Sequence, residues 1–410
     1  MAARGSPEEV VMRTFDYGKI RIDRFSARCE ELVGELFECK GRVEVVKRVY
    51  PDLLSGLRDR AFADSVGASA RLEGLAVDDA RVLGLLEGAE PEGDLEGQLH
   101  GYARALRRIE RAACGISAAD DAPTANDYEG ASVSAAARRH VSAAAAARAS
   151  AAPRSWNRAH VSTRDALAAH EDLFYARGFD GKSRYRRRDH AQMIVDGEPR
   201  SVQVSPVAAF ETPLHLGAMC DALDDALERN PSRAVVLIAV FMVDLMCVRP
   251  FDEGTGRVSR LLAHQMLVQS GFDVCMYVSL DRLFEQDAMA YYDALNACAA
   301  GWDRSRNSYE PFVAYWLEKL SCAYAELLAL TPLATGGHPS KSERVRMFFS
   351  ENPGVHAKRD VALALSDVST STIEAALGDL VKEGYLRKVG AGRSTSYELA
   401  GGSCSHEGAR

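Results

Sequence analysis

Apolar residues recur at helical spacing through most of the chain. Between residues 20 and 60, apolar side chains such as Leu32, Leu36 and Val43 are separated by four or seven positions, and no strand-like alternation is present. This spacing places them on one face of a helix. Similar patterns predict helices over residues 59–75, 78–86 and 95–109, after about residue 163, and from about residue 212 to residue 330. The chain is therefore expected to be mainly α-helical.

One long segment departs from this pattern. Residues 131–153 contain twelve alanines with interspersed serines and arginines, and almost no large side chains to bury. Such a composition is typical of low-complexity sequence. The pattern divides the chain into an N-terminal helical region (1–111), an Ala-rich low-complexity insertion (112–158), a helical core (159–333), a C-terminal domain (341–400) and a tail expected to be disordered (401–410).

A short β-hairpin is predicted within the helical core. The segments Ala191–Val195 and Ser201–Val204 flank Asp196-Gly197, and Asp-Gly is a strong signal for a tight turn between two strands. The core is expected to be helical apart from this hairpin.

The C-terminal domain follows the pattern helix, helix, turn, helix, strand, turn, strand. Val368–Ser371 form the predicted turn, Thr372–Glu383 form the amphipathic third helix, and Tyr385–Val389 and Ser394–Leu399 form the strands. This order resembles a winged helix-turn-helix, an α+β fold. The resemblance implies DNA contacts within residues 369–393. The residues concerned are Ser369, Thr370, Ser371 and Thr372 toward the major groove, and Arg387, Lys388 and Arg393 near phosphates.

The charge of this domain leaves an alternative open. Residues 341–399 carry nine basic and eight acidic side chains, and DNA-binding domains usually have a larger basic excess. Dimerisation or docking to another protein is therefore an equal expectation for the domain.

Composition narrows the class of protein. The chain carries 50 basic and 58 acidic side chains, a formal charge of −8, so any contact with nucleic acid must come from a local patch. Nine scattered cysteines without a C-x-x-C pair argue against a disulfide framework or a zinc site and indicate a cytoplasmic setting. The start lacks the apolar core of a signal peptide. The longest apolar run, Ala234 to Val243, is shorter than the roughly 20 residues that a bilayer needs. A soluble protein without membrane contact is expected.

The candidate chemistry lies between two predicted helices, in the stretch RPFDEGTGRVSR from Arg249 to Arg260. A Gly-x-Gly turn that enters a helix exposes backbone N–H groups and the positive end of the helix dipole, which together bind phosphate. Arg257 and Arg260 add guanidinium groups suited to phosphate oxygens. Glu253 could hold a magnesium ion that bridges phosphates. The alternative is a glycine-rich connection between helices with solvated arginines.

This stretch resembles the motif of the Fic (Fido) family, H-P-F-x-[DE]-G-N-G-R-x-x-R. The matching residues are Pro250, Phe251, Glu253, Gly254, Gly256, Arg257 and Arg260. The resemblance implies an all-helical core with a small β-hairpin flap. It also implies transfer of AMP from ATP to a Ser, Thr or Tyr hydroxyl of a protein, with Mg²⁺ held by Glu253. The nucleotide-binding positions that it implies are Phe251, Gly254, Thr255, Gly256, Arg257 and Arg260.

Two further segments fit the same resemblance. SARLEG, from Ser69 to Gly74, is similar to the family's inhibitory motif. In the family that glutamate, here Glu73, pairs with the second motif arginine, here Arg260, and blocks placement of the ATP γ-phosphate. Ser69 and Glu73 are at i and i+4, on one helix face. The predicted hairpin falls where the family has its flap, so residues 185–206 are expected to dock a target protein by strand addition.

A pair of tyrosines gives a softer match. Tyr291 and Tyr292, in AYYDAL, resemble a stretch near the family's nucleotide-base pocket. Packing in the core is the alternative for both side chains.

The motif departs from the family at the position of its catalytic histidine. In the family the histidine accepts the hydroxyl proton, and here that position is Arg249. Arginine stays protonated in proteins and cannot be a general base. Loss of a positioned base removes roughly 10²–10⁴ in rate. His264, His190 and Asp252 are the alternative bases that the sequence offers.

A second departure is Thr255, which replaces the motif asparagine. Threonine keeps a hydroxyl donor, but its β-branch resists a positive φ. If the turn needs a left-handed residue there, either Thr255 is strained or the loop differs from the family's, and in both cases weaker nucleotide binding is expected.

Three hypotheses follow. The first is a working nucleotidyl- or phosphotransferase with a displaced base. The resemblance favours a Fic-type protein adenylyltransferase scaffold that binds ATP, with transfer weak or absent because of Arg249. The second is a non-catalytic, nucleotide-responsive regulator, gated by Glu73, that acts through the C-terminal DNA-binding domain. The third is a structural adaptor whose motif is a relic. The sequence leaves open the target protein, the DNA site and whether the protein is a homodimer.

Overall fold

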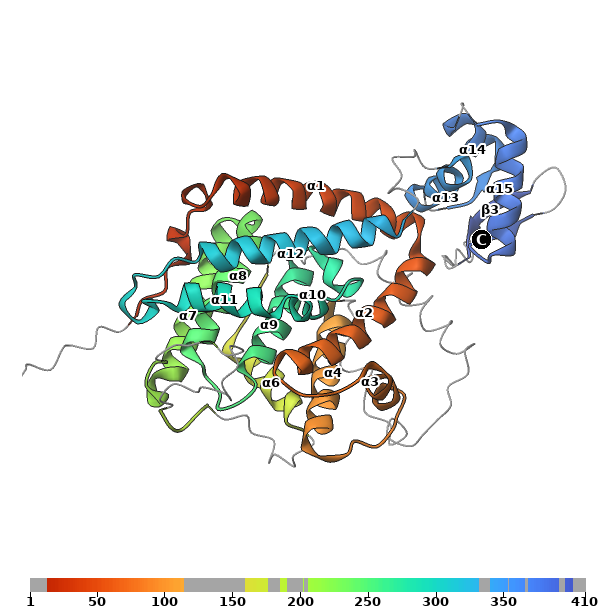
Figure 1. Ribbon diagram of the computed structural model, residues 1–410. Helices are drawn as coiled ribbons and strands as arrows, with labels where there is room; N and C mark the ends of the chain where they lie inside the picture. Colours follow the sequence, from red (N-terminus) through yellow and green to blue (C-terminus); the bar gives the residue numbers. More distant parts are fainter. Residues whose placement is uncertain are drawn as a thin grey trace, which may run out of the picture. The chain divides into compact units, whose positions relative to one another are not determined.

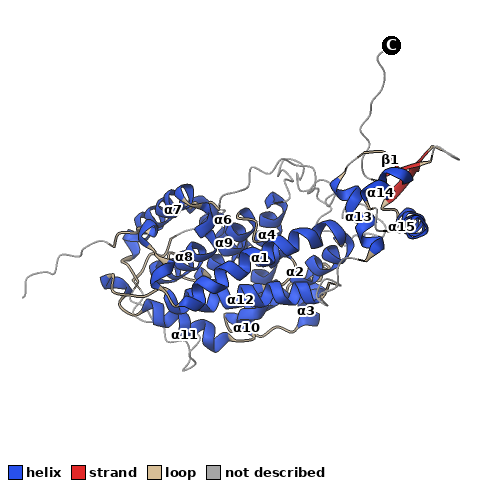
Figure 2. Cartoon of the chain, turned by 90° about the horizontal axis from the view of Figure 1, so that it is seen from above, coloured by secondary structure: helices blue, strands red, loops and turns tan. Residues whose placement is uncertain are grey.

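The computed structural model describes residues 13–113, 159–175, 185–189, 202, 206–331, 340–352, 354–365, 368–390 and 395–400. Helices dominate these residues, and the strands among them form one small three-stranded sheet (Figure 1, Figure 2). The expectation of a mainly α-helical fold is therefore confirmed. Outside the described residues lie nearly all of the predicted insertion (112–158), most of the predicted hairpin (191–204) and the tail (401–410).

The described residues fall into two compact units. The first unit contains those of the ranges 1–36, 60–113 and 154–323, and the second those of 37–59 and 324–410. The α-helices with residues in the first unit are α1 (Ala27–Val49), α2 (Pro51–Leu72), α3 (Asp79–Leu86), α4 (Gly93–Ala113), α6 (Thr163–Leu173), α7 (Thr212–Arg229), α8 (Ala234–Val248), α9 (Thr255–Gln269), α10 (Leu280–Glu285), α11 (Ala288–Ala299) and α12 (Glu310–Ala329). Its short 3₁₀ helices are η1 (Tyr17–Lys19), η2 (Ile22–Arg24), η6 (Ala209–Glu211), η7 (Pro231–Arg233), η8 (Asp273–Met276) and η9 (Trp302–Arg304).

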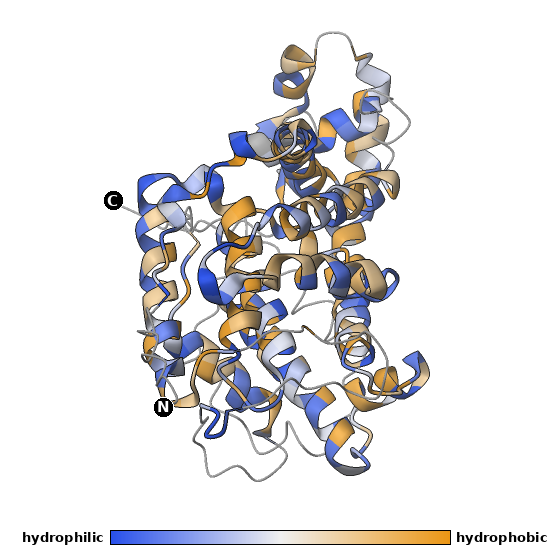
Figure 3. Cartoon of the chain, turned by 60° about the vertical axis from the view of Figure 1, so that its left-hand side comes forward, coloured by the Kyte–Doolittle hydropathy of each residue, from blue (hydrophilic) through white to orange (hydrophobic). Residues whose placement is uncertain are grey.

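Helix α8 is the buried centre of the first unit. Every residue of α8 except Met246 is buried, as its continuous apolar run predicts. The stretch Pro231–Val248 is long and apolar enough to cross a membrane, but 78% of it is buried inside the protein. Helix α8 packs against α7, α9 and α11, and α9 packs in turn against α4 and α6. Most helices in Figure 3 carry both apolar (orange) and polar (blue) residues, as amphipathic helices around a core do.

One carboxylate is buried in this apolar helix. Asp244 is fully buried and accepts hydrogen bonds from Tyr17 Oη (2.8 Å), Trp302 Nε1 (2.7 Å) and Tyr309 Oη (2.7 Å). The guanidinium of Arg13 lies 3.7 Å from Oδ1 of Asp244. Burial raises the pKa of Asp244, and Arg13 and the three donors oppose that shift. The carboxylate therefore joins the N-terminal segment and the segment around η9 to α8.

The second unit contains the C-terminal domain. Its elements are α13 (Lys341–Glu351), β1 (His356–Ala357), α14 (Lys358–Ala364), α15 (Thr370–Lys382), β2 (Leu386–Val389) and β3 (Ser396–Leu399). The sheet has the order β1-β3-β2 and is antiparallel, with His356 opposite Tyr397 and Leu386 opposite Leu399. The helices and the β2–β3 pair occur in the predicted order. The core of the domain is formed by Val345, Phe349, Val361, Val368, Ile373, Ala376, Leu377, Leu380 and Leu386.

Two details of this domain differ from the sequence-based expectation. The third helix begins at Thr370 rather than at Thr372, because Ser369 is its N-cap and its Oγ accepts from Thr372 N (3.3 Å). Strand β1 was not expected, because a strand of two residues has too short a pattern to be recognised.

The Asp244 network generates a stability prediction. Asp244→Ala is expected to lower the free energy of unfolding by about 3–5 kcal/mol, because three buried donors lose their acceptor and Arg13 loses a counterion. Urea denaturation measures the change. The control is Asp225→Ala, since the side chain of Asp225 is 70% exposed beside Arg229, and this variant is expected to stay within about 0.5 kcal/mol. Equal stability of the two variants would show that the network contributes little.

Candidate functional site

The motif stretch forms the turn between α8 and α9. Arg249 ends α8 in the left-handed region (φ 47°), and its N–H donates to Leu245 O (2.9 Å). Gly254 is the N-cap of α9 with φ 77°, and α9 begins at Thr255. The turn therefore delivers the chain to a helix N-terminus, where free backbone N–H groups and the helix dipole attract anions.

The two glycines of the turn are required by close contacts. A methyl group added to Gly254 would lie 3.1 Å from the ring of Phe174. A methyl group added to Gly256 would overlap with Oε1 of Glu73. The carboxylate of Glu73 therefore lies directly against the first turn of α9, the place that favours an anion.

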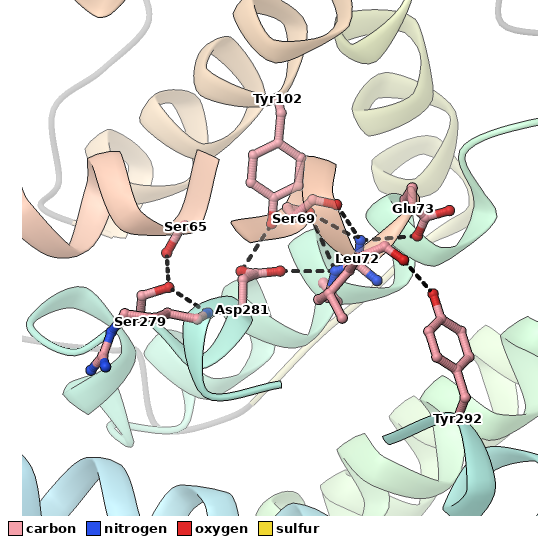
Figure 4. Close-up of polar contacts among 10 residues, drawn as sticks. Ser65, Ser69, Leu72, Glu73, Tyr102, Ser279, Asp281 and Tyr292 are labelled. Atoms are coloured by element: carbon pink, nitrogen blue, oxygen red, sulfur yellow. Dashed lines mark hydrogen bonds and ion pairs between the residues drawn. The ribbon is translucent and has the colours of Figure 1, made fainter. Parts of the chain in front are cut away.

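The structure brings Ser69, Glu73 and Arg260 together, as the resemblance implies (Figure 4). Nη2 of Arg260 donates to Oε1 of Glu73 (3.0 Å), to Oγ of Ser69 (3.0 Å) and to the backbone oxygen of Ser69 (3.1 Å). The Arg260 side chain is 2% exposed and that of Glu73 is 26% exposed. This is a charge-assisted contact between the end of α2 and α9; an inhibitory role for Glu73 stays a prediction.

Arg260 has a second acidic partner, which the sequence did not indicate. Nε of Arg260 lies 2.8 Å from Oδ1 of Asp281 in α10, and the other oxygen of Asp281 accepts from Tyr102 Oη (3.1 Å). Burial opposes the positive charge of Arg260, but Glu73 and Asp281 outweigh it and hold the pKa of Arg260 well above its ordinary value. Neither Asp281 nor Tyr102 lies in a motif, so neither could be recognised from the sequence.

Arg257 is the other guanidinium at this helix end. It is 5% exposed, and its guanidinium carbon lies 5.7 Å from the centre of the Phe174 ring. Burial lowers the pKa of Arg257, and the carboxylate of Glu73 opposes the shift.

Two buried donors at this site lack an acceptor. Among the described residues, neither Nε of Arg257 nor Nη1 of Arg260 has a hydrogen-bond partner. An unsatisfied buried donor costs about 1–3 kcal/mol, and more when the group is charged. The residues present therefore fit an anion with several oxygens better than the single carboxylate of Glu73.

Arg186, which lies in no motif, forms hydrogen bonds to the backbone of the motif turn. Its backbone N–H donates to Pro250 O (2.9 Å) and its Nε to Arg249 O (2.8 Å), while Nη2 donates to Val207 O. Arg186 is 2% exposed, and burial lowers its pKa. The described start of the predicted flap (185–206) is thus joined to the motif turn. The run of arginines around Arg186 was the available signal in the sequence.

Arg249 is half-buried at the position of the motif histidine. Burial lowers the pKa of Arg249, and the carboxylates of Glu73 and Asp252 oppose the shift. A guanidinium placed here adds positive charge to the site but supplies no proton acceptor.

The structure places Thr255 differently from the expectation. The left-handed residue is Gly254, and Thr255 is the first residue of α9 with a helical backbone. Its Oγ1 donates to Phe251 O (3.4 Å). The condition for strain at Thr255 is therefore not met, because the turn takes its positive φ one residue earlier.

The ring of Phe251 lies in the protein interior. It is completely buried and stacks on His170, with ring centres 4.0 Å apart. Phe251 thus supports the turn by packing. Tyr291 and Tyr292 are also buried, and Tyr292 Oη donates to Leu72 O (2.9 Å), so both pack against the segment that carries Glu73.

The structure describes two of the three alternative bases. Nε2 of His264 is buried and lies 3.7 Å from Oε1 of Glu110 in α4. Asp252 is exposed beside the turn, and His190 lies outside the described residues.

A metal ion at this site would need ligands from a bound phosphate and from water, in addition to protein side chains. Glu253 is exposed immediately before Gly254. Within the part of the chain that the structure describes, no three His, Cys, Asp or Glu side chains cluster as a metal site. Glu253 fits Mg²⁺ only as one ligand among phosphate and water oxygens, which is how this ion is commonly bound.

Comparison with known proteins agrees with this geometry. Residues 160–267, which run from before α6 into α9, match the family model described as Fic/DOC family. No curated protein is detectably similar to the chain. A Fic family protein from Desulfovibrio desulfuricans G20 is similar in structure over 94% of this chain and 98% of its own, with 19% sequence identity and a TM-score of 0.51.

Two other solved structures are more distant. A Fic domain containing signaling protein from Bacteroides thetaiotaomicron is similar over 76% of this chain and 99% of its own, with 15% identity and a TM-score of 0.48. Fic-1 from C. elegans is similar over 76% of this chain and 74% of its own, with 18% identity and a TM-score of 0.47. Residues 160–267 are thus similar to the Fic/DOC family, and the Desulfovibrio structure has the same fold.

The turn generates a second stability prediction. Gly254→Ala is expected to lower the free energy of unfolding by about 1–3 kcal/mol, because alanine resists the positive φ and its methyl group would press on Phe174. Gly217→Ala in α7 is the control, since nothing lies within 4 Å of the added methyl group. That variant is expected to gain up to about 1 kcal/mol. Urea denaturation of both variants measures the difference, and a neutral Gly254→Ala would contradict the assigned turn.

Proposed function

We propose that the Fic domain of this chain binds ATP with Mg²⁺ at the N-terminus of α9, that Glu73 blocks this binding, and that AMP transfer is weak or absent. The observation that carries the proposal is the position of the Glu73 carboxylate. It lies against Gly256 and on Arg260, where a phosphate would be bound by the same charges. A carboxylate that occupies an anion site competes with any other anion for it.

The binding residues follow from the site. The N–H groups of the first turn of α9 and the guanidinium groups of Arg257 and Arg260 would hold phosphate oxygens, and Glu253 would hold Mg²⁺ together with them. Bound MgATP supplies the activated AMP group that Fic-type transfer requires. Arg249 adds a third positive charge near these groups.

Arg249 also explains the expected lack of transfer. A hydroxyl that attacks phosphorus must lose its proton, and a guanidinium cannot accept one. The loss of a positioned base corresponds to roughly 10²–10⁴ in rate, or about 3–5.5 kcal/mol. His264 faces Glu110, which supports the absence of a substitute on α9.

The partner in this proposal is a protein that docks at residues 185–206, and the setting is the cytoplasm. Arg186 supports this assignment, because it joins the start of that segment to Arg249 and Pro250. A docked segment would then lie beside the motif turn.

Transfer of label from α-³²P-ATP, with Mg²⁺, to the protein itself tests the proposal. Glu73→Gly alone is expected to incorporate no label, because the base is still missing. Glu73→Gly with Arg249→His is expected to gain label by roughly 10²-fold or more over background. Histidine is among the residues that tolerate the left-handed backbone of position 249.

The matched control is Glu73→Gly with Arg249→Ala, which removes the guanidinium without adding a base. Label in the single variant would reveal a substitute base and overturn the proposed inactivity. Label in the alanine variant would show that Arg249 merely obstructs transfer.

We propose a regulatory function through the C-terminal domain as a second candidate. Its three helices and antiparallel sheet in the order β1-β3-β2 support a winged helix-turn-helix. Ser369, Thr370 and Ser371 are exposed at the start of α15, and Lys388 is exposed on β2. The exposed face of α15 also carries Glu374 and Asp379, which would limit DNA contact to its first turn.

Binding of the full chain to a mixed-sequence DNA duplex, followed by fluorescence anisotropy over a series of salt concentrations, tests this candidate. Lys388→Glu is expected to weaken binding and to reduce the slope of affinity against salt by about one counterion. Lys19→Glu makes the same charge change at a side chain that is 85% exposed in the first unit, and should have no effect. Equal binding by both variants would favour a docking or dimerisation role.

A further inference from the structure

Arg260 has two carboxylate partners that differ in accessibility. The side chain of Glu73 is 26% exposed at the end of α2, whereas that of Asp281 is 10% exposed on α10. Loss of the exposed partner would still leave the buried guanidinium with a counterion. A buried charge without any partner is strongly destabilising. Because Asp281 remains paired with Arg260, the carboxylate of Glu73 can move away without leaving the guanidinium unpaired.

The two carboxylates also meet different edges of the guanidinium. Oδ1 of Asp281 forms an ion pair with Nε (2.8 Å), which donates a hydrogen bond to Ser69 Oγ (3.2 Å), whereas Glu73 accepts from Nη2 (3.0 Å). Nη1 has no partner among the described residues and lies 3.4 Å from the position of a methyl group on Gly256. Both Nη atoms therefore border the place where the Glu73 carboxylate lies. Nε is on the opposite edge of the guanidinium, next to Asp281.

Asp281 is itself held on two sides. Its Oδ2 accepts from Tyr102 Oη on α4 (3.1 Å), and Asp281 lies in the first turn of α10, where the helix dipole favours a carboxylate. Ser279 caps that helix by accepting from Arg282 N (3.1 Å), and Ser65 Oγ on α2 donates to Ser279 Oγ (2.8 Å), as Figure 4 shows. These contacts do not involve Glu73, so they persist when its carboxylate moves away.

We propose that Asp281 is a positioning residue of the anion site: it holds Nε of Arg260 so that Nη1 and Nη2 face an incoming terminal phosphate once Glu73 has left. The inference rests on the proposed function, since it assigns the ligand as ATP. Glu73 and a phosphate then alternate on the Nη edge, and Asp281 keeps the guanidinium oriented in both states. Tyr102 does not contact the anion in this arrangement; it orients Asp281 through its hydrogen bond to that carboxylate.

Calorimetric titration of MgATP and of AMP into full-length variants tests this inference. All variants carry Glu73→Gly, so that the anion site is accessible. Asp281→Asn in this background keeps the side-chain shape but removes the charge that orients Arg260. It is expected to weaken ATP binding by about 10- to 100-fold, the range for a lost interaction with a charged group. AMP lacks the terminal phosphate, and its affinity is expected to change by less than about threefold.

Glu285→Gln is the matched control. Glu285 lies one turn further along α10 and accepts from Arg71 Nη2 (3.1 Å) rather than from Arg260. It loses the same charge from the same helix, and its ATP affinity is expected to equal that of Glu73→Gly alone. A general defect of α10 would lower ATP affinity in both variants, or lower ATP and AMP affinity together.

Tyr102→Phe covers the case in which Asp281→Asn does not fold. It removes only the hydroxyl that donates to Asp281, and a weaker loss of ATP affinity, about three- to tenfold, is expected. Unchanged ATP affinity in Asp281→Asn, or in Tyr102→Phe where that is the folded variant, would overturn the inference while leaving ATP binding intact. Absence of ATP binding in Glu73→Gly alone would instead overturn the proposed function, and the inference with it.

Discussion

The buried positive charge of Arg260 is the constraint on which the site depends. The Arg260 side chain is 2% exposed, so its charge must be paired, and its partners come from two separate elements: Glu73 and Ser69 at the end of α2, and Asp281 on α10. The pairing therefore holds the end of α2 and the start of α10 against α9. In the proposed function, a phosphate that binds here replaces the one partner that is partly exposed, the carboxylate of Glu73.

The rest of the first unit brings this charge to a helix end. Helix α8 is buried almost throughout and is joined to neighbouring segments by Asp244, so the turn after it has a fixed starting point. Arg249 and Gly254 then take left-handed conformations, and Arg186 holds the carbonyl oxygens of Arg249 and Pro250. The result is a turn held on both sides at the N-terminus of α9. In the proposed function, Arg249 contributes positive charge to this turn but no proton acceptor.

The helical fold could be predicted from the sequence, because the spacing of apolar residues reveals helices without any other information. The contact between Glu73 and Arg260 could be predicted because both residues lie in motifs that resemble those of a known family. The sequence did not indicate Asp281, Tyr102 or Arg186. Their partners are far away in the sequence, and no spacing rule links a lone carboxylate to a distant arginine. The conformation of Thr255 stayed conditional for a different reason. The start of a helix can shift by one residue, and that shift moves the positive φ from threonine to glycine.

In the proposed function, the Glu73 carboxylate occupies a phosphate site at the N-terminus of α9. This claim is tested most directly by the affinity of MgATP for the unmodified protein and for Glu73→Gln, measured by titration calorimetry under identical conditions. Glutamine keeps the size of the side chain and removes only its charge. We expect ATP to bind Glu73→Gln at least about 10-fold more tightly. Equal or weaker binding by Glu73→Gln would show that the carboxylate does not compete with phosphate, and would contradict the account.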